Sequence, residues 1–187
     1  MTIDLEEAIK ELLENDQNYT ILNSKHLSRT SFSIHKVPSD GNCLWSALAV
    51  AEFLTDSSDR VTPAVFEALH RRAVALRREI CRELVDDDLH FKEEYQPFWA
   101  SGEEYSGDAK TYNEYLDLLW DGRVFGGALE LHVASLAMER EIIVVDVPST
   151  VQEDFLINVS SRGTGLHIKK PLVLVRRNYH YDALIPR

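Results

Sequence analysis

Cys43 is the residue of this sequence whose surroundings best suit nucleophilic chemistry. It follows the tight turn Asp40-Gly41-Asn42 and begins an apolar run over residues 43–54, which predicts a buried helix. At the start of a helix the first amides have no intrahelical partner and the helix dipole is positive. Both features favour a thiolate and can stabilise a developing oxyanion, so the pattern predicts a cysteine nucleophile. A small hydrophobic side chain at the start of a core helix is the alternative interpretation.

A cysteine nucleophile needs a base within reach, and the base needs a group that orients it. Among the seven histidines, His180 stands out because Asp182 follows it two residues later in the last predicted strand. Residues two apart on a strand point to the same side, so Asp182 can hold one ring nitrogen and leave the other to face a thiol. The alternative is a structural histidine on an edge strand.

The elements that would position these residues follow from the spacing of apolar side chains. Helices are predicted at residues 4–14, 43–54, 62–84 and 111–120, and again directly after Gly126-Gly127, whereas 15–30 is predicted to be irregular. Strands are predicted at 32–37, 142–147, 155–159, 172–176 and 181–185. Helices dominate the first two thirds and strands the last third, which predicts an α+β fold.

Composition limits the class of protein. The 187 residues carry 20 basic and 31 acidic side chains, a net charge of 20 − 31 = −11. This length predicts one globular domain, and the acidic balance argues against nucleic acid as a partner. The two cysteines cannot form a disulfide framework, and no stretch approaches the ~20 apolar residues of a membrane span. We therefore expect a protein of a reducing, cytoplasmic compartment with no membrane association.

Three segments together resemble a known family. Asp40-Gly41-Asn42-Cys43-Leu44-Trp45 resembles the nucleophile motif of the ovarian tumour (OTU) domain cysteine proteases, in which Phe is usual where Trp45 stands. Phe125-Gly126-Gly127, followed by an apolar helix that contains an acidic residue, resembles a second family element, in which Trp is commoner than Phe125. His180-Tyr181-Asp182 resembles the C-terminal histidine motif. All three occur in the family order.

The resemblance implies a role for each matching residue. Cys43 would be the nucleophile, His180 the general base and Asp182 its orienting group, and Asp40 belongs to the catalytic signature while it shapes the turn. Asn42 and the Cys43 amide, with Gly41 in the loop, would form the oxyanion hole. No metal or cofactor is expected. The residues expected to bind the substrate are Trp45, Glu103, Glu104, Phe125, Gly126, Gly127, Tyr179 and Tyr181.

The family also implies a fold and an activity. The fold would be papain-like, with a small, mostly antiparallel sheet packed between helices and the nucleophile at the start of a central buried helix. Residues 1–30 would form an N-terminal helix and a connecting segment, and 31–187 the catalytic domain. The activity would be deubiquitination, by a monomer that acts on ubiquitin or polyubiquitin chains. A secreted effector of this kind would act in a host cytosol.

Two other functions remain open, namely an inactive ubiquitin-binding module on the same fold and a different papain-like cysteine hydrolase. Outside the motifs, Cys81 is predicted to be structural, and the pairs Arg71-Arg72 and Arg77-Arg78 to be a solvated helix face. The acidic stretch at 86–104 is a solvated loop by default, or a surface that attracts the basic ubiquitin.

Overall fold

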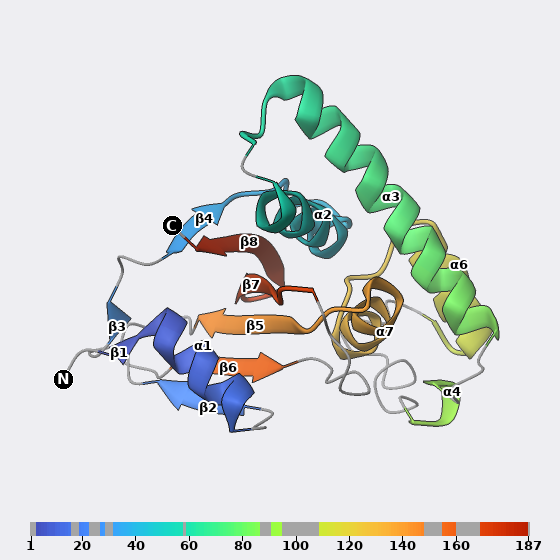
Figure 1. Cartoon of the computed structure of the whole chain (residues 1–187). Helices are drawn as coiled ribbons and strands as arrows, with labels where there is room; N and C mark the ends of the chain where they lie inside the picture. Colours follow the sequence, from blue (N-terminus) through green and yellow to red (C-terminus); the bar gives the residue numbers. More distant parts are fainter. Residues whose placement is uncertain are drawn as a thin grey trace.

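The computed structural model describes residues 3–15, 19–22, 27–28, 32–57, 59–86, 91–94, 109–147, 155–159 and 169–186. Within these residues, a mixed six-stranded sheet forms the centre of the molecule (Figure 1). The strands lie in the order β2-β6-β5-β7-β8-β4, and within this sheet, as far as the structure describes it, only the β5–β7 pair is parallel. Their bounds are β2 Tyr19–Leu22, β4 Phe32–His35, β5 Ile142–Val147, β6 Phe155–Val159, β7 Leu172–Arg177 and β8 His180–Pro186. The sheet is thus mostly antiparallel, as predicted.

The two faces of the sheet are covered by different helices. The face that carries Ile142 and Val144 packs in the main core, beneath helices α2 (Cys43–Asp56), α3 (Pro63–Asp86), α6 (Tyr112–Trp120) and α7 (Ala128–Met138). The opposite face carries Ile143 and Val145, which pack against α1 (Leu5–Glu14). Because side chains alternate along a strand, the unbroken apolar run of β5 serves both layers.

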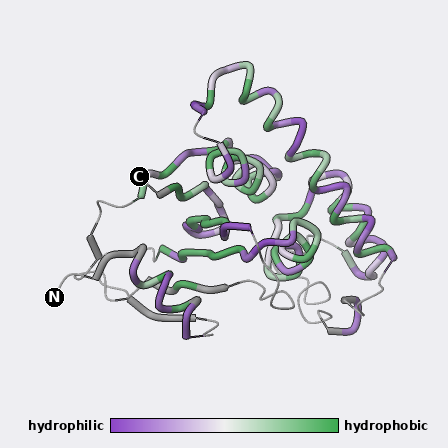
Figure 2. Tube along the Cα trace, viewed as in Figure 1, coloured by the Kyte–Doolittle hydropathy of each residue, from purple (hydrophilic) through white to green (hydrophobic). Residues whose placement is uncertain are grey.

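Helix α2 is buried for most of its length, from Cys43 to Ala51, and it lies against β8 and β7 (Figure 1). Helix α3 is longer and more exposed, and Figure 2 shows purple and green segments alternating along it, which is the pattern of a helix with one apolar stripe. The stripe that it buries comprises Leu69, Ala73, Leu76, Ile80 and Leu84. Both helices therefore begin and run close to where the sequence predicts them.

Most elements match their predictions, but one prediction was wrong. The segment predicted to be irregular, 15–30, contains β2, which pairs with β6 in the main sheet. It also contains the short strand β3 (Leu27–Ser28), which pairs with another short strand, β1 (Ile3–Asp4), at the start of the chain. The sheet therefore continues across the predicted division between residues 30 and 31, and that division stays a prediction. A short helix, α4 (Phe91–Glu94), lies within the acidic stretch. None of the helices that the structure describes is both long and apolar enough to span a membrane.

Candidate active site

Cys43 is the first residue of α2 and is 3% exposed. Its Sγ atom lies 3.9 Å from the backbone oxygen of Tyr179, in the two-residue turn that joins β7 to β8. Asn178 begins this turn at φ 53°, a left-handed conformation that asparagine tolerates better than most residues. The hairpin therefore brings the residue just before His180 against the thiol.

His180 and Asp182 face each other on β8, as their spacing predicts. The Nε2 atom of His180 lies 3.1 Å from Oδ1 of Asp182, and the same oxygen accepts a hydrogen bond of 2.9 Å from the backbone N–H of Val37. The Nδ1 atom of His180 is buried and has no hydrogen-bond partner among the described residues. Asp182 thus holds one ring nitrogen and leaves the other available for proton transfer.

Burial and the surrounding backbone shift the pKa of the Cys43 thiol in opposite directions. Burial raises the pKa of the Cys43 thiol, and the nearby charge of Asp40 raises it further. The backbone groups of Tyr181, Leu44 and Cys43 lower it, but their effect is smaller than that of burial. The backbone groups around the start of α2 thus act in the predicted direction, but desolvation of the charged form outweighs them, so the net pKa is raised.

The turn before Cys43 is closed by its own hydrogen bonds. Oδ1 of Asp40 accepts from the backbone N–H of Asn42 at 2.9 Å, and its backbone oxygen accepts from the N–H of Cys43 at 3.2 Å. The oxyanion-hole candidates expected from the sequence are Asn42 and the amide of Cys43. Asp40 therefore shapes the turn as expected, and both candidate donors are occupied by Asp40 here.

Arg77 lies beneath this turn, although sequence analysis placed it on a solvated helix face. The residue is only 6% exposed, and its Nη1 donates a hydrogen bond to Oδ1 of Asn42. A signal was present in the sequence: position 77 lies four residues after Ala73 and seven before Leu84, so it shares the buried side of α3. The neighbouring Arg71 and Arg78 are exposed, as predicted.

The aromatic residues expected to bind the substrate divide into two groups. Phe125 and Tyr179 are 44% and 43% exposed, so their rings are accessible to a partner. Trp45 and Tyr181 lie in the main core at 0% and 1% exposure. The expectation that these two contact the substrate is corrected by their burial: they can only support the site from beneath.

Gly126 and Gly127 are buried where α7 begins, close to α2. A Cβ atom on Gly126 would lie 2.2 Å from Cδ2 of Leu44, so any side chain at this position would force Leu44, which follows Cys43, to shift. The N–H of Gly127 donates to Oε2 of Glu130 at 2.6 Å. Complete burial raises the pKa of Glu130 to about 7. This carboxyl is the acidic residue of the second motif, and it caps α7 and holds the glycine segment.

The remaining predicted residues lie elsewhere. Glu103 and Glu104 are outside the described residues. Cys81 is buried, and its Sγ contacts the backbone oxygen of Leu116 at 3.5 Å. Within the described ranges, no three His, Cys, Asp or Glu side chains cluster in a way that could hold a metal ion.

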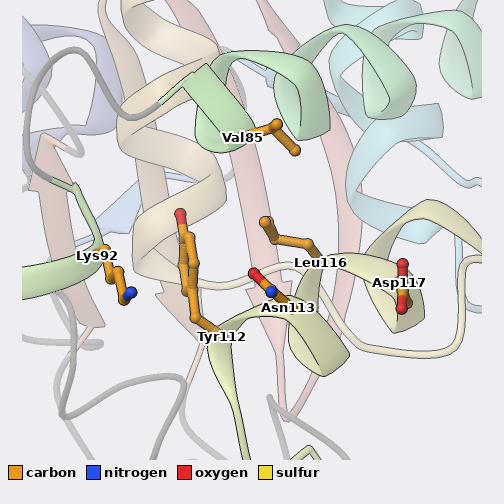
Figure 3. Close-up of a pocket in the computed structure, with 6 residues that line it drawn as sticks. All are labelled: Val85, Lys92, Tyr112, Asn113, Leu116 and Asp117. Carbon is orange, nitrogen blue, oxygen red and sulfur yellow. The ribbon is translucent and has the colours of Figure 1, made fainter.

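A pocket of about 480 Å³ lies away from these residues. Figure 3 shows its lining: Val85 from the end of α3, Lys92 from α4, and Tyr112, Asn113, Leu116 and Asp117 from α6. Neither Cys43, His180 nor Asp182 lines it. The candidate active site is therefore the junction of α2 with the β7–β8 hairpin, and not this pocket.

A family model described as OTU-like cysteine protease matches residues 38–182. Among solved structures, an OTU domain in complex with ubiquitin has a TM-score of 0.55 at 18% identity, over 91% of this chain and 77% of that one. The viral OTU domain protease from Dera Ghazi Khan virus also has a TM-score of 0.55, at 16% identity over 90% and 86% of the two chains.

An OTU deubiquitinase from Wolbachia pipientis bound to ubiquitin has a TM-score of 0.52 at 13% identity, over 84% of this chain and 97% of that one. None of the curated proteins compared with the sequence matches it. At these identities the likeness to solved structures shows the fold, which is the helix-and-sheet arrangement expected from the sequence. The match of the family model, which spans all three sequence motifs, is independent of those structural likenesses.

Proposed function

Because this chain belongs to the family of OTU-like cysteine proteases, we propose that it is a deubiquitinase, which hydrolyses the isopeptide bond at the C-terminus of ubiquitin. The observation that carries the proposal is the ring of His180, which Asp182 holds through Nε2 and whose Nδ1 has no partner in the part of the chain that the structure describes. This histidine begins the strand after a turn that contacts the Cys43 thiol. A nucleophile, a base and an orienting carboxylate are what thiol-dependent acyl transfer requires.

The proposed reaction begins with proton transfer from the Cys43 thiol to Nδ1 of His180. The resulting thiolate attacks the isopeptide carbonyl, and the C–N bond breaks as His180 returns the proton to the departing lysine amine. A thioester then joins ubiquitin to Cys43. Water, deprotonated by His180, attacks this thioester and releases the ubiquitin carboxylate and the thiol. Asp182 stabilises the imidazolium in both half-reactions and keeps the ring oriented.

The oxyanion would form next to the Asp40–Cys43 turn. Because the amides of Asn42 and Cys43 donate to Asp40, they can donate to an oxyanion only after this turn rearranges. We therefore propose that substrate binding opens the turn. The raised pKa of Cys43 favours the thiol over the thiolate, so His180 would have to take the thiol proton before the attack.

Ubiquitin is the proposed partner because the comparison structures include OTU domains bound to it. The exposed rings of Phe125 and Tyr179 offer apolar contact area, with Tyr179 itself in the turn against Cys43. The net charge of −11 favours encounter with a basic protein over encounter with an acidic one. The acidic residues Glu103 and Glu104 belong to this proposed steering as a prediction from the sequence alone.

A ubiquitin probe with a C-terminal electrophile tests the proposal. The wild-type protein should form a covalent adduct, Cys43→Ala should form none, and Cys81→Ser should serve as a matched cysteine control that still reacts. Tight binding to ubiquitin without an adduct would instead indicate a ubiquitin-binding module. Neither binding nor reaction, from a folded protein, would favour a different cysteine hydrolase and would refute the proposed substrate.

A further inference from the structure

Arg77 is a buried cation at the edge of the candidate active site. A guanidinium taken out of water loses its hydration, so its burial is unfavourable unless the protein provides acceptors. Its Nη1 finds one in Oδ1 of Asn42, the residue just before the nucleophile. Burial lowers the pKa of Arg77, whereas the charges of Asp121 and Asp40 raise it, so two carboxylates lie within its electrostatic reach.

The backbone around Arg77 is shaped to admit it. Gly122 has φ +71°, and a Cβ atom built on it would lie 2.1 Å from Nη1 of Arg77. Gly41 lies directly against Gly122, because a Cβ on Gly41 would lie 2.3 Å from the backbone oxygen of Gly122. Two glycines thus let three segments approach closely: the Asp40–Cys43 turn, the segment after α6, and the Arg77 side chain of α3.

We propose that Arg77 is a positioning residue that anchors the Asp40–Cys43 turn through Asn42, and so holds the nucleophile and the oxyanion donors in register. Arg77 donates its hydrogen bond to the side-chain oxygen of Asn42, whereas Asp40 accepts from the backbone N–H of Asn42. The two contacts use different atoms of Asn42. The hydrogen bond from Arg77 can therefore persist when the Asp40 bonds open for the substrate. The amides of Asn42 and Cys43 can then donate to the oxyanion in place of Asp40, while Arg77 keeps the turn in the same position.

This inference rests on the proposed function for its effect on the rate, but not for the anchoring itself. Two readouts keep them apart. Hydrogen exchange of the backbone amides at residues 40–44 reports the anchoring without any substrate. The turnover number per active site, with active sites counted by the ubiquitin probe, reports the catalytic consequence. A residue that only stabilises the fold would change the fraction of active protein but not the turnover of each active site.

The variants are Arg77→Met, Arg77→Lys and Asn42→Ala, with Arg72→Met as the control. Arg72 lies on the same helix and pairs with Glu52 and Glu79, away from the turn. We expect Arg77→Met and Asn42→Ala to speed exchange at residues 40–44 at least 10-fold and to lower kcat per active site by about 10- to 100-fold, with little change in KM. Arg77→Lys keeps the charge but not the planar donor geometry, so its loss should be intermediate.

The double variant Arg77→Met/Asn42→Ala should lose no more than either single variant, because both remove the same contact. If Arg77→Met does not fold, Asn42→Ala tests the contact from the other side, since Asn42 lies in a half-buried turn. Unchanged exchange at 40–44 in a folded Arg77→Met protein would overturn the proposal, as would a kcat per active site equal to or above that of the wild type. Accelerated exchange in a protein that never reacts with ubiquitin would support the anchoring and refute the proposed function.

Discussion

Oδ1 of Asp182 lies 3.1 Å from Nε2 of His180, and the same oxygen accepts the amide proton of Val37. One carboxylate atom therefore both orients the proposed base and connects β8 to the segment after β4. The proposed catalytic role of Asp182 and its structural role can be separated by the choice of substitution.

Asp182→Asn keeps an acceptor for the Val37 amide but removes the negative charge that stabilises the imidazolium. We expect kcat to fall by about 10²- to 10⁴-fold with nearly wild-type stability. Asp182→Ala should lose a similar amount of activity and also about 1–3 kcal/mol of unfolding free energy, because the Val37 amide then lacks its partner. Steady-state kinetics and urea unfolding of the two variants measure both effects. Equal stability of the two variants would contradict the structural role.

The charge of Asp40 raises the pKa of Cys43, so removing that charge should have the opposite effect. Asp40→Asn retains a side-chain oxygen that can accept from the Asn42 amide. We expect the rate of Cys43 alkylation by iodoacetamide, followed by mass spectrometry, to rise with pH earlier in Asp40→Asn than in the wild type. Asp59→Asn, a change at an exposed position, provides the control. A pH profile that moves to higher pH would be inconsistent with the assigned cause.

Glu130 is completely buried, and its pKa of about 7 lies above the ordinary value of 4.5. The folded state therefore favours the neutral carboxyl, so the stabilisation is complete below pH 4.5 and is lost as the pH rises towards 7. Glu130→Gln stays neutral and can still accept from the Gly127 amide. We expect the unfolding free energy of the wild type, measured relative to Glu130→Gln, to fall by roughly 3 kcal/mol between these pH values.

Denaturant unfolding at several pH values measures this difference. Glu67→Gln, an exposed change on α3, should show no such trend relative to the wild type. A constant difference between the wild type and Glu130→Gln across the range would mean that Glu130 is already ionised in the fold.

Gly126→Ala should disturb the start of α2, because the new methyl group would lie 2.2 Å from Cδ2 of Leu44. Overpacking of this kind destabilises a protein by about 1–3 kcal/mol. Since Leu44 follows Cys43, we also expect slower labelling by the ubiquitin probe. Leu44→Val removes Cδ2, so it should restore part of the lost stability in the double variant. If Leu44→Val and Gly126→Ala are simply additive in thermal unfolding, the two residues do not clash.

Phe125→Ala and Tyr179→Ala should each raise KM for a ubiquitin substrate by about 10-fold, with kcat largely retained, because both rings are exposed and neither takes part in the proton transfers. Phe66, which is 37% exposed on the first turn of α3, provides a matched aromatic control. An equal change in KM for Phe66→Ala would show that the effect is not local.

The sequence predicted the parts of this molecule that depend on local pattern. The apolar run after Cys43 becomes a buried helix, and the two-residue spacing of His180 and Asp182 brings their side chains together. Both results follow from backbone geometry alone, since side-chain direction repeats along a helix or a strand.

What the sequence did not predict depends on contacts between distant segments. β2 carries little periodicity and becomes a strand because β6 provides a pairing edge, with Tyr19 opposite Asn158. Arg77 is polar and was expected in solvent, yet Gly41 and Gly122, far apart along the chain, create the space that buries it. The raised pKa of Cys43 likewise reflects packing around the thiol, which a helix terminus alone does not reveal.

The amide of Val37 links the proposed orienting carboxylate, Asp182, to an edge of the sheet. β4 is an edge strand that pairs only with β8 within the described sheet, and the ends of edge strands open more readily than the core. Each opening that separates Val37 from Asp182 releases the carboxylate that holds His180. Warming should therefore lower the proposed activity before the protein unfolds as a whole. The activity that remains at each temperature would then report how often Val37 separates from Asp182.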